Sequence, residues 1–253
     1  MDSEDKETCY QYCSKCNSEI NVTARYCKVC GCSQKSVAII QTEASLKLVK
    51  LKQLALFYLI EVILCLSSDF IKAFQTFSGL LIVTALLAIN AVYFCYQESE
   101  NTSWNLAVKS FSLYKIIIYS LLSIVCSLVV NYSTNWLNQK FFLGQANYYR
   151  FFLSLSYGKT VMILFIAILP AIFEELGYRG FVLKNLMNIV DERQAIFITS
   201  FLFAIIHISF ISMYWLLPFA LFLSYVAVKE KTLLYGIVFH FCFNLTSCIL
   251  DLI

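Results

Sequence analysis

The stretch Pro170-Ala-Ile-Phe-Glu174-Glu175-Leu-Gly-Tyr-Arg179-Gly180-Phe places two carboxylates and a guanidinium in a hydrophobic part of the chain. An ionisable side chain at bilayer depth is costly unless it faces protein or trapped water. On a helix, Glu175 and Arg179 stand four residues apart and can pair. Glu174 lies about 100° around the helix from its neighbour and points elsewhere. The stretch therefore predicts a helix inside a membrane bundle; standing alone, it could instead mark a helix end at the lipid headgroups.

Composition gives the same setting. Of the 253 residues, 60% are hydrophobic and 14% are charged, which is typical of a polytopic membrane protein. We therefore predict an all-α transmembrane bundle of about seven spans, with an eighth possible between Asn131 and Tyr157, where we favour an interfacial or re-entrant element. The seven apolar segments are Leu54–Ser68, Gly79–Tyr96, Leu113–Asn131, Thr160–Phe173, Ala195–Ile211, Tyr214–Val228 and Leu233–Leu250.

Charge suggests orientation rather than a polyanionic partner. The net charge of +3 is too small to indicate nucleic acid, and the basic residues fall mainly in loops. Their distribution favours a cytoplasmic N-terminus in a multi-pass cell-membrane protein. The first apolar segment begins near Leu54, too late for a cleaved secretory signal. We thus expect the N-terminal region to stay in the mature protein, with the lipid bilayer as its partner.

Two cysteine pairs near the N-terminus resemble a zinc ribbon. Cys13-x-x-Cys16 and Cys27-x-x-Cys30 are separated by ten residues, and two such turns can complete a tetrahedral four-sulfur site for a structural Zn²⁺. A module this small gains its folding energy from the metal. A disulfide-paired or disordered tail is the alternative, and the flanking Cys9 and Cys32 could each substitute for a ligand.

These features divide the chain into three parts. We predict a zinc-ribbon module at 1–35, a polar and basic linker at 36–53, and a transmembrane domain at 54–253 whose core is 159–253. The linker could lie along the membrane surface or be a solvated connector. The ribbon could bind substrate, recruit a protein partner or regulate access.

The chain's two histidines lie in apolar segments downstream. His207 ends Phe203-x-x-x-His207, and His240 precedes Asn244 by four residues, so His240 and Asn244 share a helical face. If the fourth helix runs to about Met187, the helical rise brings Glu174 and His207 to nearly the same depth. Four polar groups from three helices then converge.

These three motifs, in this order on successive spans, resemble the CAAX prenyl protease and bacteriocin-processing family of intramembrane endopeptidases. The resemblance covers roughly Lys159 to Ile253 and implies a water-filled cavity where a peptide bond is cut. It implies that Glu174 and His207 activate water and that His240 and Asn244 support the oxyanion. The expected substrate is a membrane-associated peptide or protein, cut by a site that faces the cytoplasm, with Glu175 and Arg179 completing the first motif.

Several alternatives stay open at this stage. Glu174, His207 and His240 could compose a catalytic zinc site of the two-His, one-carboxylate kind, although the chain lacks a His-Glu-x-x-His helix. A non-enzymatic scaffold or immunity protein is a second class, and a proton-relaying transporter is disfavoured because no internal repeat is visible. Glu61 could face the cavity or pair with a neighbour.

Overall fold

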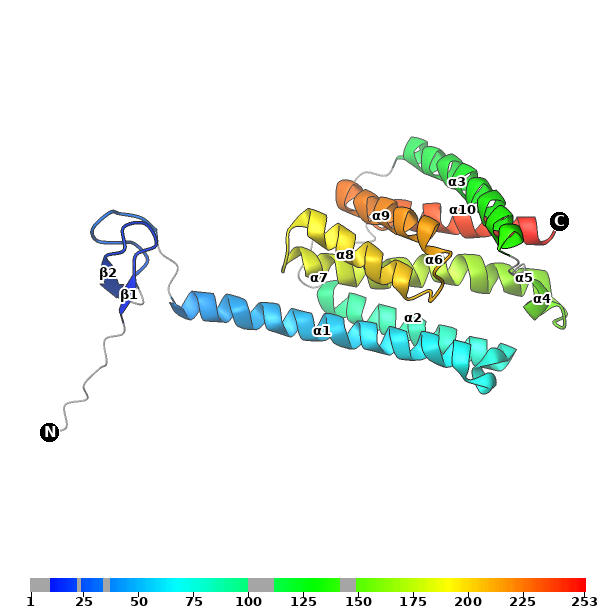
Figure 1. Cartoon of the computed structure of the whole chain (residues 1–253), viewed down its shortest axis with the longest axis horizontal. Helices are drawn as coiled ribbons and strands as arrows, with labels where there is room; N and C mark the ends of the chain where they lie inside the picture. Colours follow the sequence, from blue (N-terminus) through cyan, green and yellow to red (C-terminus); the bar gives the residue numbers. More distant parts are fainter. Residues whose placement is uncertain (1–9, 22–23, 34–36, 100–111, 142–148) are drawn as a thin grey trace. The chain divides into compact units, whose positions relative to one another are not determined.

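The computed structural model describes residues 10–21, 24–33, 37–99, 112–141 and 149–253 (Figure 1). The chain divides into two compact units, Met1–Gln53 and Leu54–Ile253. The predicted linker at 36–53 is helical from Val37 onward, because helix α1 extends over Val37–Phe70. No glycine or proline interrupts residues 37–53, and their alanines, leucines and lysines favour a helix. Cys9 and residues 142–148 of the predicted interfacial element lie outside the described residues.

The first unit holds a small antiparallel hairpin. Strands β1 (Tyr10–Tyr12) and β2 (Glu19–Asn21) pair with Tyr10 opposite Asn21 and Tyr12 opposite Glu19. Each cysteine pair forms a tight turn closed by a backbone hydrogen bond, from Asn17 N to Cys13 O at 3.0 Å and from Gly31 N to Cys27 O at 2.9 Å. Asn17 and Gly31 have positive φ angles of 55° and 69°, the left-handed conformation that asparagine and glycine adopt most readily. The two turns therefore have matching geometry.

The second unit is all-α, as predicted. After α1 come a short 3₁₀ turn, two long helices, a one-turn helix, a segmented central helix and three further helices. Their bounds are η1 Lys72–Gln75, α2 Phe77–Ser99, α3 Leu113–Lys140, α4 Tyr149–Phe152, α5 Gly158–Met162, η2 Ile163–Ile168, α6 Leu169–Glu174, η3 Glu175–Leu183, α7 Lys184–Met187, α8 Glu192–Ile205, α9 Met213–Glu230 and α10 Leu234–Asp251.

Segments α5 to α7 form one continuous helix, Gly158–Met187, which we call the central helix. It ends at Met187, as the depth estimate supposed. It is not regular throughout, because η2 and η3 have the wider i→i+5 turn of a π-helix. Such turns occur often at functional sites, since they shift side chains out of the α-helical register. Glu175 and Arg179 lie in η3.

Four helices of the described chain are long and apolar enough to cross a membrane: Phe77–Gln97, Leu113–Lys140, Gly158–Met187 and Leu234–Asp251. The predicted count of seven to eight spans is not confirmed. The predicted span Ala195–Ile211 stops early, because α8 ends at Ile205 and Ile208 takes a left-handed φ of 51°. Its 14 residues extend only about 21 Å, against the roughly 30 Å of a bilayer core.

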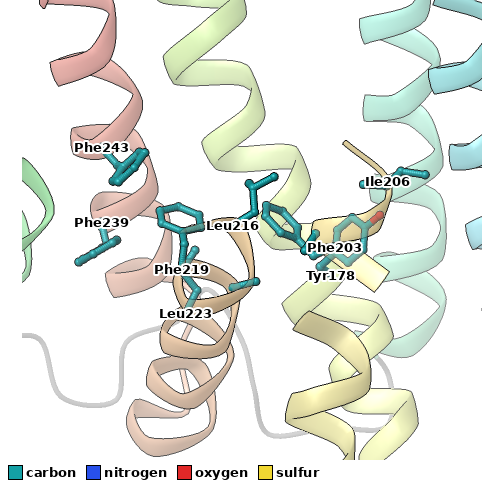
Figure 2. Packing of buried hydrophobic residues seen from close by; sticks show 10 residues of the cluster. Tyr178, Phe203, Ile206, Leu216, Phe219, Leu223, Phe239 and Phe243 are labelled. Carbon is teal, nitrogen blue, oxygen red and sulfur yellow. The ribbon is translucent and has the colours of Figure 1, made fainter. Parts of the chain in front are cut away.

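The central helix lies between two groups of helices (Figure 1). Helix α2 packs on one side, against η3 and α6, and α10 packs on the other, against η2 and α6, with α3 lying along α10. Figure 2 shows the aromatic core that joins η3, α8, α9 and α10. Its labelled members are Tyr178, Phe203, Ile206, Leu216, Phe219, Leu223, Phe239 and Phe243. This core holds the elements that carry the three motifs against one another.

Candidate active site

Glu175 is the centre of a fully buried polar network. Its Oε1 accepts a hydrogen bond from Arg179 Nη1 at 2.9 Å and one from His240 Nδ1 at 3.1 Å. Arg179 also donates Nη2 to the carbonyl of Ala220 at 3.0 Å and lies 4.6 Å from the ring of Phe203. The pairing of Glu175 with Arg179 follows the predicted spacing. The bond to His240 is new, and it joins the first motif to the third.

This network fixes the ring of His240. A carboxylate can only accept, so Nδ1 of His240 carries the hydrogen and Nε2 points away from Glu175. Nε2 lies 3.8 Å from Oε2 of Glu174, whose side chain is 33% exposed. The two neighbouring glutamates therefore have different surroundings: Glu175 is enclosed, whereas Glu174 reaches open space.

His207 is oriented by its own helix. Its Nδ1 lies 2.8 Å from the carbonyl oxygen of Phe203, which can only accept a hydrogen bond. Nδ1 therefore carries the hydrogen, and Nε2 presents its lone pair. The side chain of His207 is exposed at the end of α8. This arrangement gives His207 a free basic nitrogen.

Asn244 compensates for a proline. Pro170 has no N–H for the carbonyl of Ile166, the acceptor four residues earlier in a regular helix. Asn244 Nδ2 donates to that carbonyl at 3.0 Å. An amide NH₂ has two hydrogens, so the second remains for another acceptor. Asn244 thus has a structural partner besides the role that the family resemblance implies.

Three small residues position these groups, and the motifs gave no sign of them. On α3, Ser123 Oγ donates to the carbonyl of Phe239 at 2.5 Å and Ser127 Oγ donates to that of Phe243 at 2.8 Å. These carbonyls belong to the residues immediately before His240 and Asn244. At Gly236 a β-carbon would lie 3.0 Å from Oε2 of Glu175, so glycine leaves room for that carboxylate.

The four polar groups line one cavity. This polar cavity has a volume of about 590 Å³ and its wall includes Glu174, His207, His240 and Asn244. Many other wall residues are polar as well: Asn131, Thr134, Asn135, Asn138, Ser209, Ser212, Ser247 and Asp251. The convergence expected from depth along the helices is therefore present in the structure.

The polar cavity reaches one particular end of the bundle. Asn138 and Asp251, both in its wall, lie in the last turns of α3 and α10. The turns with Arg193 and Lys231 lie at the other ends of α8 and α9, away from the Ser209–Ser212 wall. If those basic turns are cytoplasmic, as charge predicts, the cavity reaches the opposite side. The side of the membrane that the site faces therefore stays a prediction, tied to the predicted orientation of the chain.

The residues proposed for a catalytic zinc do not gather around one point. In the described chain, the only group of three or more His, Cys, Asp or Glu ligand atoms close enough to share an ion is the four-cysteine cluster. Glu174, His207 and His240 line one cavity without forming such a group.

The four cysteines of the first unit could hold a metal ion. Their sulfurs all lie within 4.8 Å of one another, and the pairs Cys13–Cys30 and Cys16–Cys27 are 3.6 Å apart. A tetrahedral zinc site with bonds of about 2.3 Å requires sulfurs about 3.8 Å apart, so the cluster fits zinc. Hydrogen bonds from the Ser18 side chain and from the Cys30 backbone lower the pKa of the Cys27 thiol to about 6, whereas the pKa of the Cys30 thiol in the same cluster is raised to about 12. The thiols thus share their protons unequally without a metal, and zinc itself stays a prediction.

The comparisons with known proteins agree with this site. A family model described as Type II CAAX prenyl endopeptidase Rce1-like matches residues 156–246, which include all three motifs. No curated protein and no solved structure matches the chain. The family consists of intramembrane endopeptidases, which supports a protease. Residues 156–246 are therefore similar to the type II CAAX prenyl endopeptidases of the Rce1-like family, in agreement with the resemblance of the three motifs.

Proposed function

We propose that the chain is an intramembrane endopeptidase that hydrolyses peptide bonds of membrane-associated peptides or proteins in the polar cavity. The observation that carries this proposal is that Glu174, His207, His240 and Asn244 line that one cavity. Hydrolysis needs a base beside the attacking water and donors aimed at the developing oxyanion. The cavity walls supply both.

Glu174 and His207 are the water-activating pair in this proposal. Glu174 is the glutamate with open space beside it, and Nε2 of His207 carries a lone pair because Nδ1 donates to Phe203. A water between them gives up its proton as its oxygen attacks the peptide carbonyl carbon. General-base assistance of this kind contributes about 10² to 10⁴ in rate.

His240 and Asn244 hold the oxyanion. Asn244 has a second amide hydrogen to donate, and His240 can donate from Nε2 when its ring carries both hydrogens. Glu175 stabilises that imidazolium. In that state the carboxylate of Glu175 lies between two cations, Arg179 and His240, and the partly exposed carboxylate of Glu174 approaches Nε2 of His240 at 3.8 Å. Removing an oxyanion donor typically costs about 3 to 4 kcal/mol of transition-state stabilisation.

The intermediate then collapses. The carbon–nitrogen bond breaks, the proton taken from water passes to the leaving amine, and the products are a carboxylic acid and an amine. No step of this scheme requires a catalytic metal. The same scheme puts the cleavage on the side of the membrane where α3 and α10 end.

The test compares membrane peptidomes of cells that carry the intact chain, Glu174→Gln or His207→Ala. The matched control is Glu192→Gln, because Glu192 is an exposed carboxylate in the first turn of α8 that does not line the polar cavity. We expect peptide products with the intact chain and the control, and none with the two site variants. Identical peptidomes from intact and Glu174→Gln cells would refute the protease and favour a binding protein.

The role of metal is tested separately. Cys27→Ser removes a ligand of the cysteine cluster in the full-length chain, and the purified variant is then stripped of metal with a chelator. We expect peptide cleavage to persist at undetectable metal content. Loss of cleavage that zinc restores in this variant would show that the site uses a metal after all.

A further inference from the structure

A second cavity shares a wall with the polar cavity. This side cavity has a volume of about 300 Å³, and Pro170, Glu174, Phe203 and His207 line both cavities. Its other walls come from α1, α2, the central helix and Ile206 at the end of α8, and they are mostly apolar. A group held in the side cavity therefore lies next to the two residues proposed to activate water.

Helix α1 brings carboxylates to this apolar space. Phe57, Glu61, Cys65 and Asp69 all line it, and their four-residue spacing puts them on one face of the helix. Glu61 is 7% exposed, whereas Asp69 is exposed near the C-terminal end of α1. No lysine or arginine is among the described residues that line the cavity. The side cavity is thus lined mostly by apolar side chains and has two carboxylates, the buried Glu61 and the exposed Asp69.

Two details indicate a ligand rather than simple packing. The hydroxyl of Tyr178 is buried and has no hydrogen-bond partner in the described chain, although Tyr178 lines the cavity. Figure 2 shows this ring beside Phe203 with its oxygen on the side of Ile206, which also lines the cavity. Asn90 Nδ2 donates to Oε1 of Glu61 at 2.8 Å and so holds the carboxylate in the wall. Buried polar groups normally have partners, so an unpaired hydroxyl points to a donor that arrives with a ligand.

We propose that the side cavity binds the basic side chain, lysine or arginine, of a substrate residue next to the scissile bond. The aliphatic stem packs between the apolar walls, and the cationic end donates to Glu61 and to the oxygen of Tyr178. Asp69 attracts the cation at the exposed end. This proposal rests on the protease function and names its substrate preference.

The experiment uses the full-length chain in lipid nanodiscs and a library of membrane-tethered reporter peptides with a randomised juxtamembrane stretch. We select the reporters that the intact chain cleaves and the Glu174→Gln variant does not. Each is resynthesised as pairs of peptides that differ only in having lysine or methionine at one juxtamembrane position. At one position, we expect kcat/KM to favour lysine by about ten- to a hundredfold, the range for a hydrogen-bonded charge.

The variants assign that preference to the side cavity. Glu61→Gln keeps an acceptor for Asn90 and removes the charge, so the lysine preference falls to about onefold while methionine reporters are cleaved as before. Tyr178→Phe removes only an unpaired hydroxyl and lowers the preference several-fold. The control Glu192→Gln removes an exposed carboxylate that lines neither cavity, and the preference is retained. Cleavage without a basic preference, or a preference that survives Glu61→Gln, overturns the inference and leaves the protease intact.

A binding arm covers the case in which no reporter is cleaved, which would refute the protease itself. The thermal unfolding temperature of the Glu174→Gln chain is measured with n-hexylammonium or with n-hexanol, two probes of equal length and different charge. Stabilisation by the ammonium alone, abolished when Glu61→Gln is added, supports a cation-binding cavity. Equal responses to the two probes overturn it.

Discussion

The substitution Glu→Gln should mainly lower the stability of the protein at Glu175 and mainly lower its activity at Glu174. Glu175 has a side chain that is 1% exposed and accepts from Arg179 and His240 through one oxygen. Glu174 is 33% exposed and has only a 3.8 Å approach to His240. The substitution is nearly isosteric at both positions, so differences report charge and partners rather than volume.

In Glu175→Gln, the buried guanidinium of Arg179 loses its carboxylate partner and keeps only neutral contacts. The bond to the Ala220 carbonyl at 3.0 Å and the contact with the Phe203 ring at 4.6 Å remain. Breaking a buried ion pair costs about 3 to 5 kcal/mol, and the remaining contacts put the expected loss near 3 kcal/mol. Glu174→Gln breaks no such pair and should change the free energy of unfolding by less than about 0.5 kcal/mol.

Activity should follow a different order. Glu174→Gln removes the proposed base and should lower kcat by about 10² to 10⁴. Glu175→Gln removes only the group that orients His240, so about a 10- to 100-fold loss is expected where the variant is still folded.

The assay is equilibrium unfolding of the purified variants in bicelles, followed by tryptophan fluorescence, with kcat measured on the same preparations. Equal stabilities for the two variants, or a larger loss for Glu174→Gln, would refute the argument that Glu175 is the buried partner and Glu174 the free one.

Four further substitutions test the rest of the active site and the cysteine cluster. Gly236→Ala places a β-carbon 3.0 Å from the Glu175 carboxylate, so the rate of cleavage should fall about tenfold or more. Membrane insertion should change little, and a western blot of membrane fractions measures it. Asn244→Ala removes the amide that donates to the Ile166 carbonyl and should lower the free energy of unfolding by about 1 to 3 kcal/mol. Adding Pro170→Ala restores a backbone N–H for that carbonyl and should recover part of the loss. Additive effects of the two substitutions would contradict this expectation. Cys27→Ser should abolish the binding of one zinc per chain, which elemental analysis measures. The thermal unfolding transition of Leu54–Ile253 should stay the same. A shift of that transition would show that the two units are coupled.

Local spacing explains what could be predicted from the sequence. The bond between Glu175 and Arg179 joins residues four apart on one helix, and each cysteine turn closes within five residues. The apolar content of the chain required helices, because a bilayer leaves backbone groups no other partners. The ordered motifs were specific enough to indicate the family, and the match at residues 156–246 confirms that resemblance.

One expectation failed because it depended on where a helix ends. Apolar residues continue past Ile205, so hydropathy extended the fifth span to Ile211, whereas a left-handed Ile208 turns the chain there. The linker at 36–53 stays a prediction; its residues are helical from Val37, because polar residues without glycine or proline do not stop a helix. Hydropathy reports solvent preference and says little about these backbone turns.

The sequence by itself determined a helical membrane protein with a cysteine cluster and a set of ionisable groups too costly to lie in lipid. Only the tertiary structure decided their partners. His240 bonds to a glutamate 65 residues away, Asn244 caps a carbonyl 78 residues away, and Glu61 lines the same cavity as Glu174. Such contacts depend on how helices pack and rotate against one another, which residue spacing along one helix does not encode. That packing makes Glu175 a buried anchor and leaves Glu174 facing the space where chemistry can occur.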